Sequence, residues 1–589
     1  MPDRIRTFPL AAGARAAQLT AGSIPGPEGE AQLAQLAAGV DRRLDEQFAG
    51  ASLGVGELAW ELAWITDEMA EEDRAALFVL AACVLASWRQ GSTRLPLDTP
   101  FQMMAEVLGL PDELVARARE LAATERDSGL IGSAGTRAPL VIDGNAATTG
   151  RLWHEEQSIA RALAARLAAG PQDAMTAPVD AAGRPFAVIT GGPGTGKTTA
   201  ARAIVEELVA QGVPARRIAL AAPTGKAAHQ LLRSLGGTIQ SLGVQPPMTL
   251  HRLLGVAQEG GRTRHHRGNP LDVRALIVDE ASMVDHWLAD RLLEALPAEA
   301  SLTLLGDPMQ LPAVESGAML RDLVALGAGI FELRHSYRLD AATSSGAAIV
   351  RAARNVQEGA PPDELGECRS PRDLPGEGTW LLPLARSEGR LGEQLDERLD
   401  EMLDAWSARP GVTQVLTITR VGPRGSNTLN RQMHARHARS RGWSTTAPFL
   451  PGEPVIVTRN DAARRLSNGD TGVVVQDDDH DGLFVELDTT DGRKTLPVGA
   501  LRGSLELAHA ITVHKSQGSE YEEALLVLPA ADMPLLSREI LYTGMTRASR
   551  TLVIAGDPEL LAVGAARPAE RYTGLVEALE TQLGVAGVD

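Results

Sequence analysis

The chain has 589 residues, of which 44% are hydrophobic and 22% charged, and its formal net charge is −18. This composition excludes a disordered chain, and the length favours several domains over a single hydrophobic core. The acidic total excludes a surface that is basic all over, but it does not exclude a local basic groove.

Features of secreted or membrane proteins are missing from the sequence. The N-terminal stretch "FPLAAGARAAQL" is weakly apolar and is interrupted by Arg15, unlike a signal peptide. The longest strongly apolar run, residues 75–88, is too short to span a bilayer and predicts a buried helix. The two cysteines, Cys83 and Cys368, lie far apart, which excludes a disulfide framework and a four-cysteine metal site. We expect a cytoplasmic protein without a membrane partner.

The first part of the chain, from residue 30 to about 125, repeats apolar residues at intervals of three and four. This spacing is typical of amphipathic helices. No chemical motif accompanies it. The sequence therefore predicts a helical N-terminal domain over residues 1–145.

Short apolar runs then alternate with helical segments. The runs are "FAVIT", "RIALAAP", "ALIVDE", "LTLLGD" and "GIFELR", all between residues 186 and 334. Each is typical of a buried parallel strand, so their alternation predicts a doubly wound α/β domain over residues 146–336. The same texture predicts a second α/β domain, made of residues 337–449 and 504–589.

A segment of different texture interrupts the second α/β domain. Residues 450–503 contain "PVIVTRND", "TGVVVQ", "LFVELDT" and "RKTLPV", joined by turns such as "NGD" and "TDG". Short strands with Asn-Gly and Asp-Gly turns indicate antiparallel pairing. We expect a small inserted β-barrel here.

The stretch "GGPGTGKTTA", residues 191–200, follows a predicted strand and precedes a predicted helix. In that context the pattern G-x-x-x-x-G-K-[ST] indicates a phosphate-binding loop. Glycines let backbone N–H groups approach the phosphates of ATP. Lys197 would reach the β- and γ-phosphates as a compact charge, and Thr198 would ligate Mg²⁺. The predicted nucleotide contacts of this loop are Gly191, Gly192, Pro193, Gly194, Thr195, Gly196, Lys197, Thr198 and Thr199.

Acidic and amide side chains follow two later strands. Asp279 and Glu280 end the run "ALIVDE". Asp279 fits a Mg²⁺ ligand and Glu280 fits the group that orients the attacking water. Gln310, in "LLGDPMQLPAV", is predicted to sense the γ-phosphate. Asp307 in the same motif is predicted to order the turn, with a loop cap as the alternative.

Two arginines are candidates for a cation that stabilises the transition state of phosphoryl transfer. They are Arg338 in "RHSYR" and Arg547 in "YTGMTRAS". If two α/β domains face each other across one nucleotide, the second must deliver this cation to the first. Such an arginine contributes about 10³–10⁵ in rate.

The order of these motifs resembles that of superfamily 1 DNA helicases. The matching stretches are "GGPGTGKTT", "APTGKAA", "TLHRLLG", "VDEASM", "GDPMQLPAV", "SYR", "VHKSQGSE" and "YTGMTRA". Among these helicases the chain is most similar to the RecD family, the alpha subunits of exodeoxyribonuclease V (RecBCD). The resemblance covers roughly residues 140–580 and, more weakly, the helical N-terminus.

The resemblance implies a fold and a function. It implies two RecA-like P-loop motor domains, an SH3-like β-barrel as the insert, and an N-terminal domain that docks partners. It also implies ATP-driven 5′-to-3′ translocation on single-stranded DNA, action at duplex ends in double-strand break repair, and RecB-like and RecC-like partners. Polarity comes from the resemblance alone.

Several residues match family motifs. Gln157 in "WHEEQ" matches the glutamine that reads adenine. Other positions match motifs that contact the DNA strand. The predicted DNA contacts are Pro223, Thr224, Lys226, Thr249, His251, Thr512, His514, Lys515 and Gln517. For His514, a satisfied core histidine is the alternative.

Lysine is rare in this chain, which has four: Lys197, Lys226, Lys494 and Lys515. Three of them lie in the motifs above, where a compact ammonium serves better than a planar guanidinium. Lys494 lies in the predicted insert. A basic loop, "RTRHHRGNP" at residues 262–270, either lines the DNA path or is a solvated loop.

Three functions compete. The first is the helicase subunit of a RecBCD complex. The second is a stand-alone RecD-like helicase, although such proteins usually have a longer N-terminal extension. The third is a scaffold with a silent motor, against which Lys197, Asp279, Glu280 and both arginine candidates argue. Nuclease activity is not predicted for this chain; it would belong to the RecB-like partner.

Overall fold

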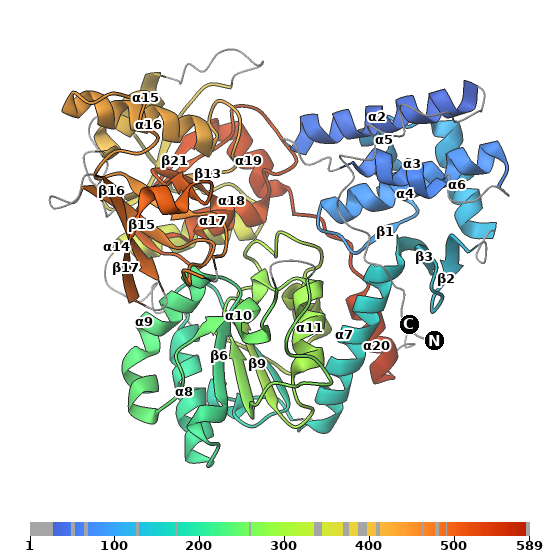
Figure 1. The fold of residues 1–589 in the computed structure, drawn as a ribbon, viewed down its shortest axis with the longest axis horizontal. Coiled ribbons are helices and arrows are strands. Elements are labelled where there is room, and N and C mark those ends of the chain that lie inside the picture. Colours follow the sequence, from blue (N-terminus) through green and yellow to red (C-terminus); the bar gives the residue numbers. More distant parts are fainter. Residues whose placement is uncertain are drawn as a thin grey trace.

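A computed structural model shows two parallel sheets, a small antiparallel insert and a helical N-terminal part (Figure 1). Within the described ranges, no helix combines the length and apolar composition needed to cross a bilayer. The structure describes residues 28–48, 54–63, 69–124, 129–171, 173–257, 261–334, 344–368, 376–386, 397–407, 413–461, 463–476, 482–489 and 492–584.

The described residues of the N-terminal part form five helices and a small sheet. The predicted buried helix is α4, in which every residue from Ala76 to Val84 is at most 2% exposed. The sheet, in the order β1-β4-β3-β2, was not predicted. The elements are α2 (Glu28–Phe48), α3 (Val55–Ala63), α4 (Glu71–Arg89), β1 (Arg94–Pro96), α5 (Thr99–Leu108), α6 (Asp112–Thr124), β2 (Ile131–Ser133), β3 (Leu140–Asp143) and β4 (Ala146–Thr149).

The first motor sheet is entirely parallel, in the order β10-β5-β9-β8-β6-β7. Strand β5, second from one edge, is buried on both faces: Phe186 and Val188 pack into one core, Ala187 and Ile189 into another. The elements are α7 (Gly150–Ala169), β5 (Phe186–Thr190), α8 (Lys197–Ala210), β6 (Ile218–Ala222), α9 (Gly225–Leu242), β7 (Met248–Thr249), α10 (Leu250–Leu254), β8 (Ala275–Val278), α11 (His286–Ala295), β9 (Ser301–Gly306), α12 (Met319–Leu326) and β10 (Ile330–Glu332).

The second motor sheet is also parallel, in the order β11-β12-β21-β20-β13-β19. Consecutive residues of β20 pack into cores on opposite faces of the sheet, Leu526 on one side and Leu525 on the other. The elements are α14 (Ser344–Gln357), β11 (Gly366–Glu367), β12 (Gly378–Pro383), α15 (Glu397–Ser407), β13 (Thr413–Thr417), α16 (Ser426–Arg441), β19 (Ala510–Thr512), α17 (Val513–Ser516), β20 (Tyr521–Val527), α18 (Arg538–Met545), β21 (Ala548–Gly556) and α19 (Pro558–Ala566).

The prediction of two α/β units with parallel sheets is therefore confirmed. Every strand run quoted from the sequence of the first unit coincides with a strand of its sheet. Parallel strands covered on both faces read as continuous apolar runs, which explains why the sequence revealed them. The exact division of the chain into five segments stays a prediction.

The insert is a five-stranded antiparallel sheet in the order β17-β16-β15-β14-β18 with its own apolar core. Its fifth strand is only three residues long and lies directly before the return to the motor sheet. The SH3-like character of the insert stays a prediction. Its strands are β14 (Pro454–Val457), β15 (Thr471–Gln476), β16 (Leu483–Thr489), β17 (Gly492–Pro497) and β18 (Leu505–Leu507).

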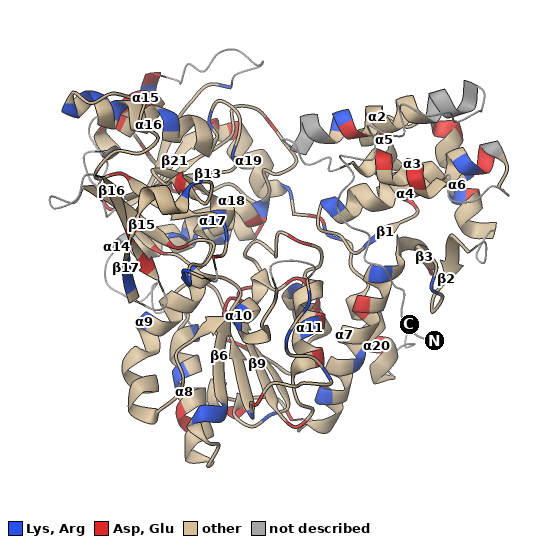
Figure 2. Cartoon of the chain, in the orientation of Figure 1, with Lys and Arg blue, Asp and Glu red and all other residues tan. Residues whose placement is uncertain are grey.

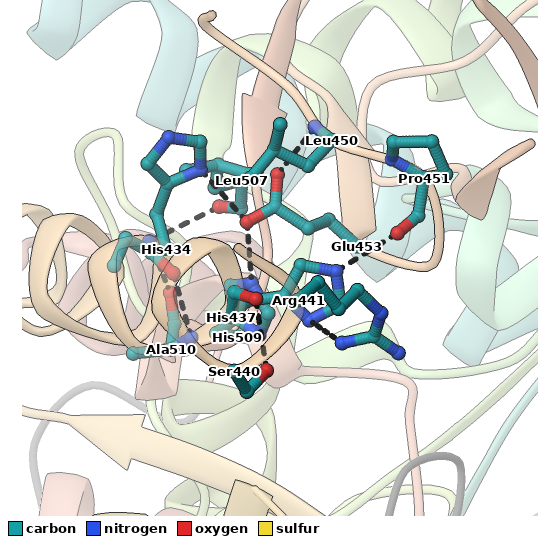
Figure 3. Close-up of polar contacts among 11 residues, drawn as sticks. His434, His437, Ser440, Arg441, Leu450, Pro451, Glu453, Leu507, His509 and Ala510 are labelled. Carbon is teal, nitrogen blue, oxygen red and sulfur yellow. Dashed lines mark hydrogen bonds and ion pairs between the residues drawn. The ribbon is translucent and has the colours of Figure 1, made fainter. Parts of the chain in front are cut away.

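The insert is joined to the second motor sheet through a buried carboxylate (Figure 3). Glu453, which is 0% exposed, accepts hydrogen bonds from His434 of α16 at 2.8 Å and from His509 at 3.2 Å. Its other oxygen accepts from the backbone of Leu450 at 2.7 Å. Burial raises the pKa of Glu453, but the bonds from His509, Leu450 and His434 outweigh burial, so the pKa lies below its usual value. Both chain connections of the insert therefore meet at one carboxylate.

The last helix, α20 (Leu575–Leu583), leaves the second motor unit and packs on α7 and α12 of the first. In Figure 1 the red C-terminal helix lies beside α7, and a red segment connects it to α19. The end of the chain thus ties the two motor units together.

Candidate nucleotide site and DNA-facing motifs

The loop between β5 and α8 has the geometry expected of a phosphate-binding loop. Gly194 and Gly196 have φ angles of 71° and 89°, a region that residues with a Cβ avoid. Lys197 begins α8, and its ammonium donates to the carbonyls of Gly191 at 2.7 Å and Gly192 at 3.0 Å. The lysine charge is therefore held at the centre of the glycine-rich turn.

Asp279 and Glu280 follow β8 at the same edge of the sheet as this loop. The backbone N–H of Glu280 donates to the Asp279 carboxylate at 2.9 Å, and Glu280 has a φ of 53°. Burial and the charge of Glu280 raise the pKa of Asp279 to about 6, while the Lys197 ammonium opposes the shift. A buried carboxylate of this kind gains from a nearby cation.

A hydrogen-bonded chain connects the two motor units behind the loop. Arg547, 5% exposed, donates to the side-chain oxygen of Gln310 at 2.9 Å. Gln310 donates to Asp307 at 3.2 Å, and the Tyr542 hydroxyl donates to the same carboxylate at 2.9 Å. Asp307 accepts both bonds and is 1% exposed, so it is a buried, shared acceptor of the network. Its other oxygen accepts from the N–H of Met309 at 3.0 Å, so Asp307 also orders the turn, as the sequence predicts.

A second pair of contacts grips the backbone next to Gln310. The N–H of Leu311 donates to the Thr543 hydroxyl at 2.8 Å, and its carbonyl accepts from Gln517 at 3.0 Å. Both partners belong to the second motor unit. A Cβ added at Gly192 would lie 3.3 Å from the Tyr542 hydroxyl, so α18 also reaches the phosphate-binding loop itself.

The structure thus gathers Lys197, Asp279, Gln310, Arg547 and Gln517 around one junction, with Glu280 beside Asp279. Tyr542 and Thr543 were missed, although both lie inside the quoted motif "YTGMTRA". Arg338 lies outside the described residues. Gln157 lies on α7, where its backbone carbonyl accepts from Arg161 at 3.1 Å.

Three threonines predicted to contact DNA cap helices at the carboxyl ends of strands. Thr224 accepts from the N–H of Ala227, and Thr249 from the N–H of Arg252, both at 3.2 Å. Thr512 accepts from the N–H of Lys515 at 3.3 Å. Each motif therefore places a helix N-terminus at the edge of a motor sheet, where backbone N–H groups favour anions.

The basic residues of these motifs lie in different environments. The ammonium of Lys226, which follows the buried Pro223, is buried and has no hydrogen-bond partner among the described residues. Lys515 forms an ion pair with Glu506 at 2.9 Å. Burial lowers the pKa of His251, and burial followed by the charge of Arg571 lowers that of His514 to about 4.

Lys494 has a structural role. Its ammonium, from β17, donates to the carbonyls of Arg464 at 3.1 Å and Arg465 at 2.9 Å. Arg465 has a φ of 54°. The lysine thus fixes a loop of the insert.

The basic loop 262–270 folds back on itself, with His266 paired to Asn269. Arg267 lines a surface pocket of about 420 Å³ together with Arg161 of α7 and Arg291 of α11. Both readings of this loop stay open.

These features define a P-loop nucleoside triphosphatase with two parallel-sheet motor units. A family model for an AAA domain matches residues 167–370, and one for a UvrD-like helicase C-terminal domain matches residues 507–555.

Curated relatives make the assignment more specific. The RecBCD enzyme subunit RecD of Mycobacterium tuberculosis is 37% identical over 426 residues, which cover 66% of this chain and 69% of the relative. That of Mycolicibacterium smegmatis is 34% identical over 470 residues, 72% of this chain and 80% of the relative. The ATP-dependent RecD2 DNA helicase of Deinococcus radiodurans is 35% identical over 405 residues, 67% of this chain and 50% of the relative.

Among solved structures, the Pif1 helicase of Candida albicans matches with a TM-score of 0.38 and 17% identity, covering 64% of this chain and 92% of that one.

The chain belongs to the RecD family. It is an ATP-hydrolysing DNA helicase of superfamily 1.

Proposed function

We propose that the chain is the 5′-to-3′ motor of a RecBCD-type complex, translocating on single-stranded DNA from duplex ends during double-strand break repair. The observation that carries this proposal is the contact between Arg547 and Gln310, which joins the two motor units behind the phosphate-binding loop. A nucleotide bound at this junction would touch both units, so hydrolysis would change their relative position.

At the nucleotide, residues 191–199 would cradle the phosphates and Lys197 would pair with the β- and γ-phosphates. Gln157 would read the adenine. Gln310 would contact the γ-phosphate, and Arg547, with Arg338, would offset the charge that develops during transfer. Glu280 would orient the attacking water.

The residues present fit a magnesium ion. Burial and then the charge of Glu280 raise the pKa of Asp279, a shift that a bound cation would oppose. Thr198 follows Lys197 in the first turn of α8. Hydroxyl and carboxylate oxygens are the ligands that Mg²⁺ prefers. When bound, the ion would neutralise charge on the β- and γ-phosphates.

The DNA strand would run along the carboxyl edges of both motor sheets. The unpaired ammonium of Lys226 would gain a phosphate partner there, which offsets the cost of its burial. Pro223, Thr224, Thr249 and His251 would contact the strand from the first unit. Thr512, His514, Lys515 and Gln517 would do so from the second.

ATP binding would close the two units on each other, and hydrolysis would open them. Gln517 links the two events, because it belongs to a DNA-facing motif and also donates to the loop that carries Gln310. Alternating grip on phosphates and bases would then move the strand.

The names of the relatives support RecB-like and RecC-like partners, with the N-terminal domain as their docking part and the nuclease in the RecB-like subunit. The two distant cysteines are both buried, and neither forms a disulfide within the described residues, which fits a reducing cytoplasm. The similarity to RecD2 supports one alternative, a helicase that acts alone.

The test is co-purification with candidate RecB-like and RecC-like proteins, followed by unwinding of duplexes with a 5′ or a 3′ overhang. We expect a stable complex, and ATP-dependent unwinding of the 5′-tailed duplex when only this motor is active. Unwinding of the 5′-tailed duplex by the chain alone, without any complex, would favour the stand-alone helicase. Unwinding from the 3′ tail alone would contradict the polarity.

A further inference from the structure

The loop from Asp307 to Gly317 is held at both ends by other parts of the chain. Its first half carries Gln310 and is gripped by the second motor unit, as described above. At its other end, the N–H of Gly317 donates to the carbonyl of Gly91 in the N-terminal domain at 2.8 Å. A loop that reads the nucleotide is thus also in contact with the N-terminal domain.

One side chain fixes that far end. A single nitrogen of Arg571, Nη1, donates to the carbonyls of Glu315 and Gly317, both at 2.9 Å. A Cβ at Gly91 would lie 2.4 Å from the guanidinium carbon, so only glycine leaves room for it. Burial, and then the charge of Arg321, lowers the pKa of Arg571 to about 10. The guanidinium therefore lies in a partly buried contact between the loop and the N-terminal domain.

Arg571 belongs to the segment that leaves the second motor unit. At the start of this segment, Arg567 pairs with Asp532 at 2.8 Å. Five residues further on, the carbonyl of Tyr572 accepts from the N–H groups of Thr93 at 2.9 Å and Arg94 at 3.2 Å. The segment 567–574 therefore runs from the second motor unit to the junction of the first unit and the N-terminal domain.

The charge of Arg571 reaches histidines in both motor units. The pKa of His286 in the first unit and that of His514 in the second are each lowered to about 4. Burial is the larger cause, and the charge of Arg571 is the second cause. His286 also donates its backbone N–H to Ser316 of the loop at 3.1 Å. Arg571 is thus close to both units as well as to the N-terminal domain.

We propose that Arg571 is a positioning residue for ATP hydrolysis, which holds the end of loop 307–317 so that Gln310 meets Arg547. Because Gly91 packs on the same guanidinium, a displacement of the N-terminal domain would release the loop. The position of the domain that we assign to partner docking would thereby set the rate of ATP turnover. This inference rests on the proposed roles of Gln310 and Arg547.

The test compares DNA-stimulated ATP hydrolysis by full-length variants at saturating single-stranded DNA. Arg571→Ala should lower kcat about 10-fold with little change in KM for ATP, as expected of a residue that acts through others. Arg571→Lys should recover much of kcat, because one nitrogen makes both bonds. Arg321→Ala is the matched control: Arg321 holds the same segment through the carbonyls of Ala569 and Arg571 without touching the loop. It should lower the thermal midpoint comparably and leave kcat unchanged.

Gly91→Ala tests the link to the N-terminal domain. It should lower kcat in the wild-type background and have little further effect on kcat in Arg571→Ala, because its methyl group would no longer meet a guanidinium. Additive effects would overturn the link. An unchanged kcat in Arg571→Ala, or an equal loss in Arg321→Ala, would overturn the positioning role. If Lys197→Gln also kept normal ATPase activity, the proposed nucleotide site itself would fail instead.

Discussion

Arg547 is the residue through which the second motor unit reaches the proposed γ-phosphate sensor. Its guanidinium donates to Gln310 and also to the carbonyls of Thr543 at 3.1 Å and Ser519 at 3.2 Å. These backbone contacts orient the side chain before any substrate binds, as a preorganised charge requires. A lysine at this position could not form the same fork.

We predict that Arg547→Ala lowers the kcat of ATP hydrolysis by about 10³-fold or more, while the Kd for ATP changes little, because the lost charge acts mainly on the transition state. Single-turnover hydrolysis and nucleotide-binding titrations measure the two quantities. The neighbouring Arg550→Ala is a matched control, since Arg550 pairs with Glu523 away from Gln310. A kcat within a few-fold of wild type would remove Arg547 from the site.

Glu156, next to the proposed adenine reader, is a buried carboxylate with an unusual pKa. It is 3% exposed and accepts a hydrogen bond from Thr93 and another, at 2.7 Å, from the N–H of Gly574. Burial raises its pKa from 4.5 to about 7, although both hydrogen bonds oppose the shift. The folded state therefore holds this proton more tightly than the unfolded state does.

This difference gives a sign to the pH dependence. Stability should fall as pH rises from about 4.5 to 7, by about 3 kcal/mol from this group alone. Glu156→Gln should remove that part of the slope and should be more stable than wild type at pH 8. Thermal midpoints at pH 5, 6 and 8 measure the effect. Glu577→Gln, an exposed neighbour, should keep the wild-type slope. Equal slopes in wild type and Glu156→Gln would contradict the assignment.

At the scale of elements, the connection of the insert is the clearest test of packing. Removing the Glu453 carboxylate would leave the donors at His434, His509 and Leu450 without their acceptor in a buried site. We predict that Glu453→Ala costs about 3–5 kcal/mol of stability and makes the connection near residue 450 sensitive to proteases. Urea denaturation and limited proteolysis measure both.

The control for this prediction is Glu486→Ala, on the partly exposed β16, which should change stability by less than about 0.5 kcal/mol. Because the pKa of Glu453 is lowered, its contribution is present above pH 4.5 and is lost as pH falls below that value. Equal effects of the two substitutions would show that the cluster does not hold the insert.

The strands of both motor sheets could be predicted because β5, β8 and β20 are covered on both faces and so read as apolar runs. The small N-terminal sheet could not, since strands of three or four residues show no period. The sequence also does not reveal that α20 packs on α7. That contact forms because the chain, after the second motor unit, returns to the first.

The candidate site also has one part that the sequence predicts and another that only the fold shows. The phosphate-binding loop is local, and its spacing was enough to predict the placement of Lys197 at the start of α8. Contacts between distant residues were not visible: Tyr542 meets Asp307 across 235 positions, and Arg571 meets Gly317 across 254. Arg571 lies in no recognisable motif, so only the fold brings it to light.

At the scale of the whole molecule, the C-terminal segment ties together two parallel-sheet units, which we propose share one nucleotide. Lys and Arg are dispersed among Asp and Glu along the chain (Figure 2), in keeping with the net charge of −18. DNA binding would therefore depend on local groups such as Lys226 and the helix N-termini at the sheet edges, since the overall charge opposes it.

The proposed nucleotide site is tested most directly by measuring ATP hydrolysis by Lys197→Gln in the presence and absence of single-stranded DNA. Lys197 is the charge at the centre of the phosphate-binding loop, held by Gly191 and Gly192. We predict that DNA no longer stimulates hydrolysis by Lys197→Gln, while the thermal midpoint of this variant without nucleotide stays close to that of wild type. Wild-type turnover by a correctly folded Lys197→Gln variant would contradict it.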